Sequence, residues 1–205
     1  MKNRQFETVI WDLGGVLIDW NPAYVFDNFF DDKEKTKYFF ENICTSDWNE
    51  EQDAGRLIAD ATDYLVKQHP EWEEAIRAYY GRWTEMLGGP IQETVEIFRE
   101  LKENTNLKFY ALTNWSGELF PVALERYDFL HWFDGRLVSG DEKTRKPFPE
   151  IYQLILDRFN IEPTKAIFID DNVRNIKAAE PFGLQTILFK NPQQLREVLV
   201  EKGLL

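Results

Sequence analysis

The 205-residue sequence predicts a three-layer α/β fold, in which helices cover both faces of a parallel sheet and a helical segment is inserted after the first strand. Short β-rich runs alternate with helical patterns along most of the chain, and such alternation is typical of parallel sheets. One long stretch after the first run has helical patterns only. Polar and charged residues follow the predicted strands, at the sheet edge where ligands of this fold class bind.

The first predicted strand covers residues 8–11, a β-branched and aromatic run that stops at Asp12 and the pair Gly14-Gly15. A short apolar run followed by glycines is typical of a buried strand that feeds a tight loop. Similar runs predict strands at residues 108–113, 166–170 and 185–189. Helices are expected between them at residues 90–103, 149–159 and 173–179, the first opened by Pro90, which a first helical turn tolerates.

Residues 19–88 are expected to form a helical cap, without a strand, between the first and second core strands. Residues 1–18 and 89–205 then form the α/β core. The cap is rich in aromatic residues and ends at Gly88-Gly89-Pro90. Within it, residues 49–56 are predicted to form a loop close to the substrate, because Gly55 permits a turn. An ordinary turn between two helices fits the same residues.

Composition excludes several classes of function. The chain has 24 Lys and Arg against 36 Asp and Glu, a net charge of −12, and residues 19–88 hold −9 of it. Such an acidic chain is unsuited to nucleic acids and to anionic membrane surfaces. We interpret the acidic cap as solvated helix faces rather than a docking surface. Cys44 is the only cysteine, which excludes an intrachain disulfide, and a cytoplasmic location is expected.

Polar residues suited to phosphoryl transfer follow the predicted strands and one loop. They are Asp12, Thr113, Asn114, Lys146, Asp170 and Asp171. An aspartate can attack phosphorus and hold it as an acyl phosphate, and neighbouring carboxylates are hard oxygen ligands for Mg²⁺. A threonine hydroxyl can bind a phosphate oxygen, and a lysine can neutralise its charge. Each residue alone is weak evidence, but their convergence at strand ends indicates a phosphoryl-transfer site.

Four motifs carry a family resemblance. Residues 11–17 (WDLGGVL), 112–116 (LTNWS), 145–152 (RKPFPEIY) and 168–176 (FIDDNVRNI) resemble the motifs of the haloacid dehalogenase superfamily. The resemblance covers essentially the whole core. It implies a Rossmann-like sheet with an α-helical cap inserted after the first motif.

The resemblance also implies residue roles. Asp12 would be the nucleophile, and Thr113 and Lys146 would bind phosphate. Independently of the resemblance, Asn114 is a candidate for contact with the substrate. Three groups would face Mg²⁺: the side chains of Asp12 and Asp171 and the main-chain carbonyl of Gly14. Asp170 would either bind the metal itself or contact the residues that bind it.

Gly14 departs from the family pattern. Most phosphatases of this superfamily carry a second aspartate two residues after the nucleophile, as general acid and base, and that position is Gly14 here. A general acid is worth about 10²–10⁴-fold in rate. We expect turnover to depend steeply on the leaving group, and Gly14→Asp to help alkyl phosphates most unless Gly14 has a positive φ. Asp19 is an alternative acid, but helix capping before Asn21 is the favoured interpretation.

The leading functional hypothesis is a Mg²⁺-dependent phosphatase of small phosphorylated metabolites that acts through an aspartyl-phosphate intermediate. The DLGG form resembles a subgroup that includes sugar-1-phosphate phosphatases, so sugar phosphates are candidate substrates. One alternative is a metal-independent haloacid dehalogenase, against which the Asp170-Asp171 pair argues, because clustered carboxylates repel unless a cation lies between them. Another alternative is a regulatory homologue that is only weakly catalytic, because Gly14 replaces the aspartate that acts as acid and base. The sequence leaves the oligomeric state open.

Overall fold

The computed structural model describes residues 6–205, and its core is a five-stranded parallel sheet. The strand order is β5-β4-β1-β6-β7, with β1 in the middle. In register, Thr8 pairs with Lys108 of β4 and with Ala166 of β6, so the carboxyl ends of the three central strands meet at one edge. The strands are β1 (Thr8–Trp11), β4 (Lys108–Thr113), β5 (Gly135–Val138), β6 (Ala166–Asp170) and β7 (Gln185–Leu188).

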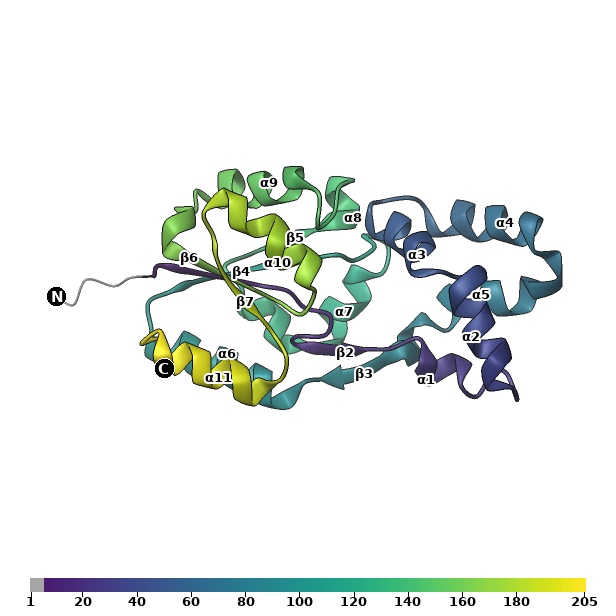
Figure 1. Ribbon diagram of the computed structural model, residues 1–205, viewed down its shortest axis with the longest axis horizontal. Coiled ribbons are helices and arrows are strands. Elements are labelled where there is room, and N and C mark those ends of the chain that lie inside the picture. Colours follow the sequence, from purple (N-terminus) through teal and green to yellow (C-terminus); the bar gives the residue numbers. More distant parts are fainter. Residues whose placement is uncertain (1–5) are drawn as a thin grey trace.

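Helices cover both faces of the sheet (Figure 1). Val9 and Trp11 of β1 belong to the apolar cluster that includes α6, α7 and α11, whereas Ile10 belongs to the cluster formed with α9 and α10. This alternation follows from the pleat of a strand, which points successive side chains to opposite faces. The predicted three-layer, Rossmann-like α/β fold is therefore confirmed. These helices are α6 (Gln92–Asn104), α7 (Phe120–Arg126), α9 (Pro149–Phe159), α10 (Val173–Ala179) and α11 (Pro192–Glu201).

The segment after the first strand is mainly helical and lies at one end of the molecule (Figure 1). It has its own aromatic packing, in which the fully buried rings of Phe26 and Phe39 lie 4.7 Å apart. Asp32 and Thr45 cap two of its helices through bonds to backbone amides. The division of the chain into core and cap at residues 18 and 88 stays a prediction. The helices are α1 (Ala23–Phe26), α2 (Lys33–Asn42), α3 (Ser46–Asp53), α4 (Ile58–Gln68) and α5 (Glu73–Gly81).

Short elements complete the described part of the chain. Single-turn 3₁₀ helices occupy residues 70–72, 83–86, 128–132, 163–165 and 180–182, and α8 (Ser139–Glu142) follows β5. Within residues 6–205, every helix is too short or too polar to cross a bilayer.

Three short strands lie where none was expected: β5 of the core sheet, and the pair β2 and β3. β2 (Ile18–Trp20) and β3 (Leu87–Pro90) pair antiparallel at the two ends of the segment 19–88, so the expectation of a strand-free segment is wrong at its limits. Pro90 ends β3 instead of opening a helix, and α6 begins at Gln92. Strands of three or four residues are too short to show an alternating pattern, and proline is tolerated in a ribbon edge.

Two local predictions in the helical segment are also corrected. The stretch expected to be a loop at residues 49–56 is helical up to Asp53, and the turn comes after it at Gly55, whose φ is +92°. Asp19 does not cap a helix: it lies in β2, and its carboxylate accepts a 2.5 Å hydrogen bond from the Tyr24 hydroxyl. The first turn of α1 is held instead by Asn21, whose side chain accepts from the Ala23 amide.

We predict that Gly140→Ala destabilises the fold, because Gly140 of α8 packs closely against the loop after β4. A Cβ at Gly140 would lie 2.3 Å from the Gly117 nitrogen and 2.8 Å from the Trp115 oxygen, both backbone atoms that cannot rotate away. Overpacking of this kind costs about 1–3 kcal/mol. Gly81→Ala is the matched control, because nothing lies within 4 Å of that position on α5. Denaturant unfolding should show a loss for Gly140→Ala only, and equal stabilities would contradict the packing described here.

Candidate active site

Three carboxylates converge at the carboxyl edge of the sheet. Asp12 directly follows β1, Asp170 is the last residue of β6, and Asp171 follows it. Each can offer one oxygen such that all three oxygens lie within 4.8 Å of one another. Asp12 and Asp170 are buried, whereas Asp171 is exposed. The strand ends therefore bring together the three acidic residues that the sequence singled out.

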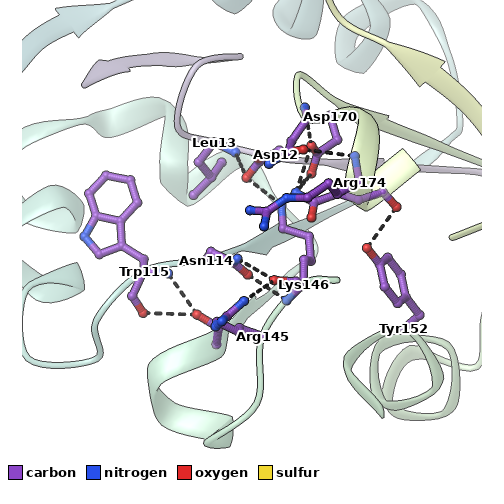
Figure 2. A network of polar contacts seen from close by, with 12 residues as sticks. Asp12, Leu13, Asn114, Trp115, Arg145, Lys146, Tyr152, Asp170 and Arg174 are labelled. Carbon is purple, nitrogen blue, oxygen red and sulfur yellow. Dashed lines mark hydrogen bonds and ion pairs between the residues drawn. The ribbon is translucent and has the colours of Figure 1, made fainter. Parts of the chain in front are cut away.

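Lys146 lies between two of these carboxylates (Figure 2). Its Nζ is 2.9 Å from Asp12 Oδ1 and 2.7 Å from Asp170 Oδ2, and its side chain has no exposed surface. Burial lowers the pKa of Lys146, but the charges of Asp12 and Asp170 raise it by more, so that its pKa lies above the usual value. A buried ammonium is stable only when it is paired in this way.

One ammonium does not balance three acidic groups. Burial raises the pKa of Asp12 to about 8; Lys146 opposes this shift and Asp170 adds to it. Partial desolvation and the charge of Asp170 raise the pKa of Asp171. These shifts indicate excess negative charge, which a divalent cation would offset. Clustered carboxylate oxygens are the donors that Mg²⁺ prefers, so the residues present fit this metal.

Asp170 and Asp171 have different surroundings. Asp170 accepts hydrogen bonds from the backbone amide of Asn172 at 2.8 Å and from the side chain of Asn175 at 3.0 and 3.1 Å, besides its bond to Lys146. Both of its oxygens are thereby engaged. Asp171 has no such side-chain partner within residues 6–205. Asp170 is thus suited to hold Lys146, and Asp171 has the freer carboxylate. Sequence reasoning missed Asn175.

Asn114 fixes the backbone of Lys146. Its side-chain nitrogen donates to the Lys146 carbonyl at 2.9 Å, and its side-chain oxygen accepts from the Lys146 amide at 2.8 Å (Figure 2). This pair of bonds, which the sequence did not reveal, places the ammonium beside Asp12. Thr113 ends β4 and is buried, and its hydroxyl has no hydrogen-bond partner among the described residues. The substrate contacts of Thr113 and Asn114 stay predictions.

The two glycines that follow Leu13 differ in conformation. Gly15 has a φ of +74°, and a Cβ there would lie 2.3 Å from Asp171 Oδ2. Gly15 therefore needs to be glycine for both backbone and steric reasons. Gly14 does not have a positive φ, and a Cβ there would have no atom within 4 Å. A side chain at residue 14 would fit, so its absence leaves open space two residues after Asp12.

A cavity of about 530 Å³ lies between the strand ends and the helical segment. Asp12, Lys146 and Asp171 line it from the sheet, and Asn49 and Asp53 of α3 line it from the opposite side. A second cavity, of about 80 Å³, shares some of this lining and has several aromatic walls. The rings are those of Trp20, Tyr80, Trp83 and Trp115. A larger cavity at the charged strand ends thus adjoins a smaller cavity with aromatic walls.

Ion pairs connect α3 to the rim of the larger cavity. Glu50 lies 2.8 Å from Arg145, which precedes Lys146, and 2.6 Å from Arg174 of α10. Arg145 and Glu50 are largely buried, which makes their pairing stronger than that of an exposed pair. Sequence reasoning missed Glu50, Arg145 and Arg174, because the pairs join residues about a hundred positions apart and no local pattern marks them.

Comparisons with known proteins agree with this geometry. Residues 6–183 match the model of the haloacid dehalogenase-like hydrolases. A sesquiterpene phosphatase of Aspergillus oryzae is 29% identical, over 87% of each chain. A phosphorylated carbohydrates phosphatase of Thermotoga maritima is 25% identical, over 88% of this chain and 83% of the relative.

A solved structure shares the fold. The HAD family enzyme of Bacteroides thetaiotaomicron, crystallised with magnesium and inorganic phosphate, has a TM-score of 0.67 at 24% identity, covering 91% of this chain and 95% of that one. Sheet order, helical layers and the family match over most of the chain lead to one assignment: this protein belongs to the haloacid dehalogenase-like hydrolases.

Proposed function

We propose that this hydrolase is a Mg²⁺-dependent phosphatase that cleaves small phosphorylated metabolites through an aspartyl-phosphate intermediate. The observation that carries the proposal is the buried Lys146, paired with Asp12 and Asp170, beside a third carboxylate and a cavity. Two relatives are named phosphatases, and a structural neighbour was crystallised with magnesium and inorganic phosphate. These names support the substrate class, and sugar phosphates are candidates within it.

The proposed first step is an attack by Asp12 on phosphorus. Its Oδ1 is held by the Leu13 amide and by Lys146, and its Oδ2 has no hydrogen-bond partner within residues 6–205. Lys146 neutralises charge on the transferred group, and the Thr113 hydroxyl binds a phosphate oxygen. Bound magnesium, held by Asp12, Asp171 and the Gly14 carbonyl, would supply the positive charge that offsets repulsion between carboxylate and phosphate.

We place the leaving group in the smaller cavity, which is lined by both aromatic rings and polar groups. Trp20 and Trp115 offer flat apolar walls, and Asn49 and Asp53 offer hydrogen-bonding groups. This combination suits a sugar ring, which presents both apolar C–H faces and hydroxyl groups. A polar metabolite with a ring is therefore the substrate class that we favour.

Asp12→Asn tests the nucleophile. The amide keeps the size of the side chain and can still accept from the Leu13 amide, but it cannot form an acyl phosphate. We expect phosphate release to fall by more than about 10³-fold while the circular dichroism spectrum is unchanged. Mass spectrometry after rapid acid quenching should find phosphate on the wild-type protein only. Wild-type turnover by the folded variant would show that the aspartyl-phosphate mechanism is wrong.

Asp171→Ala tests the metal. Loss of a carboxylate ligand should lower both Mg²⁺ affinity and turnover. The loss should be at least about 10–100-fold, which is the effect of changing residues that only hydrogen-bond to metal ligands. Calorimetric titration with Mg²⁺ measures the affinity without requiring a substrate. Asp31→Ala, an exposed aspartate between α1 and α2, is the control and should change neither quantity. Turnover indifferent to EDTA and to Asp171→Ala would favour the metal-independent dehalogenase instead.

A further inference from the structure

We propose that Asp53, at the end of α3, is the general acid and base of the reaction, supplying from the helical segment the carboxyl group that Gly14 does not supply. The inference rests on the phosphatase function proposed above and assigns one further catalytic residue to the same site.

The position of Asp53 carries the argument. It lines both cavities, the larger one together with Asp12 and Lys146, and the aromatic one together with Gly14 and Asn114. Asp53 therefore lies where the site of phosphoryl transfer meets the space for the leaving group. Because a Cβ at Gly14 would have no atom within 4 Å, no core side chain fills the place two residues after the nucleophile.

Hydrogen bonds fix Asp53 against the core. Its Oδ2 accepts from the Asn49 side chain at 3.2 Å. Its own carbonyl accepts from the Ser139 hydroxyl. Ser139 follows β5, and its hydroxyl also accepts from the Trp115 amide in the segment after β4, so the position of Asp53 is set by the same sheet edge that positions Asp12.

Asp53 is also able to carry a proton near neutral pH. Burial raises its pKa to about 7 and Glu50 adds to this, while Arg145, the Ser116 amide and Lys146 act in the opposite direction. Tyr79 and Tyr80 of α5 are the other titratable groups coupled to it, and burial raises the pKa of both, which keeps them neutral. A carboxyl group with a pKa close to the working pH can both donate and accept a proton.

The other candidate acid lies elsewhere. Asp19 accepts a hydrogen bond from the Tyr24 hydroxyl and lines neither cavity in the described part of the chain. Asp53 is the carboxylate outside the proposed metal cluster that faces the leaving-group space.

The proposed proton transfers balance over two steps. In the first, an Asp12 oxygen forms a bond to phosphorus, the bond from phosphorus to the leaving oxygen breaks with its electron pair, and the Asp53 carboxyl gives that oxygen its proton. In the second, the Asp53 carboxylate takes a proton from water as the water oxygen bonds to phosphorus. The bond from phosphorus to Asp12 then breaks, inorganic phosphate leaves, and both side chains are restored.

The test is a leaving-group series with saturating Mg²⁺ on wild-type protein and Asp53→Asn. The amide retains the shape, and its oxygen can still accept from the Asn49 side chain, but it has no acidic proton. We expect kcat/KM to fall by about 10²–10⁴-fold for alkyl phosphates and by less than about tenfold for 4-nitrophenyl phosphate, whose leaving anion needs no proton. The dependence on leaving-group pKa should be shallow for wild type, in contrast to the steep dependence expected from Gly14 alone, and steep for Asp53→Asn.

The controls separate catalysis from docking. Asp47→Asn makes the same change on an exposed residue of α3 and should leave the whole series unchanged. If Asp53 only docks α3 on the core, Asp53→Asn will lower turnover of every substrate equally, and the proposal is overturned. A steep dependence in wild type overturns it without any variant. Both results are distinguishable from failure of the proposed function, in which wild type releases no phosphate even from 4-nitrophenyl phosphate.

Discussion

The buried pairing of Lys146 with Asp12 and Asp170 is the interaction on which the rest of the site depends. An ammonium without exposed surface is tolerated only because two carboxylates lie within 3 Å of it. Those carboxylates come from strands that are neighbours in the sheet, so the pairing requires the register of β1 and β6. It also requires the backbone of Lys146 to be held, which Asn114 does from the end of β4.

The helical segment is tied to this same point. Glu50 of α3 pairs with Arg145, the residue before Lys146, and with Arg174 in the helix that follows Asp171. A displacement of α3 would therefore disturb the chain on both sides of the charged cluster. These ion pairs hold α3, which lines one side of the cavity, in position relative to the strand ends that line the other side.

Sequence reasoning recovered β1, β4, β6 and β7, because each contains a run of β-branched, aromatic or other apolar residues, and such a run has a local signature. The expected convergence of Asp12 and Asp170 also follows from the sheet, since parallel strands bring their carboxyl ends to one edge; Lys146 reaches them from the loop between α8 and α9, and the catalytic roles of all three stay predictions. Sequence reasoning missed β5, which has only four residues and begins with a glycine and an arginine, and it missed β2 and β3, which are defined by pairing with each other across the inserted segment. The face of α3 was equally unreadable: in SDWNEEQD only Trp48 is apolar, so periodicity does not show that Asn49 and Asp53 point into the cavity.

Placing the acid on α3 has an electrostatic consequence for the cluster. Asp12, Asp170 and Asp171 already share one ammonium, and burial with mutual repulsion raises the pKa of Asp12. A further carboxylate at residue 14 would add negative charge directly beside them. At residue 53 the carboxyl group lies outside the cluster, and its pKa is set by burial and by Glu50. In this proposal, the helical segment sets the pKa of the proton donor Asp53. The charged groups of the core balance the charge of the phosphate.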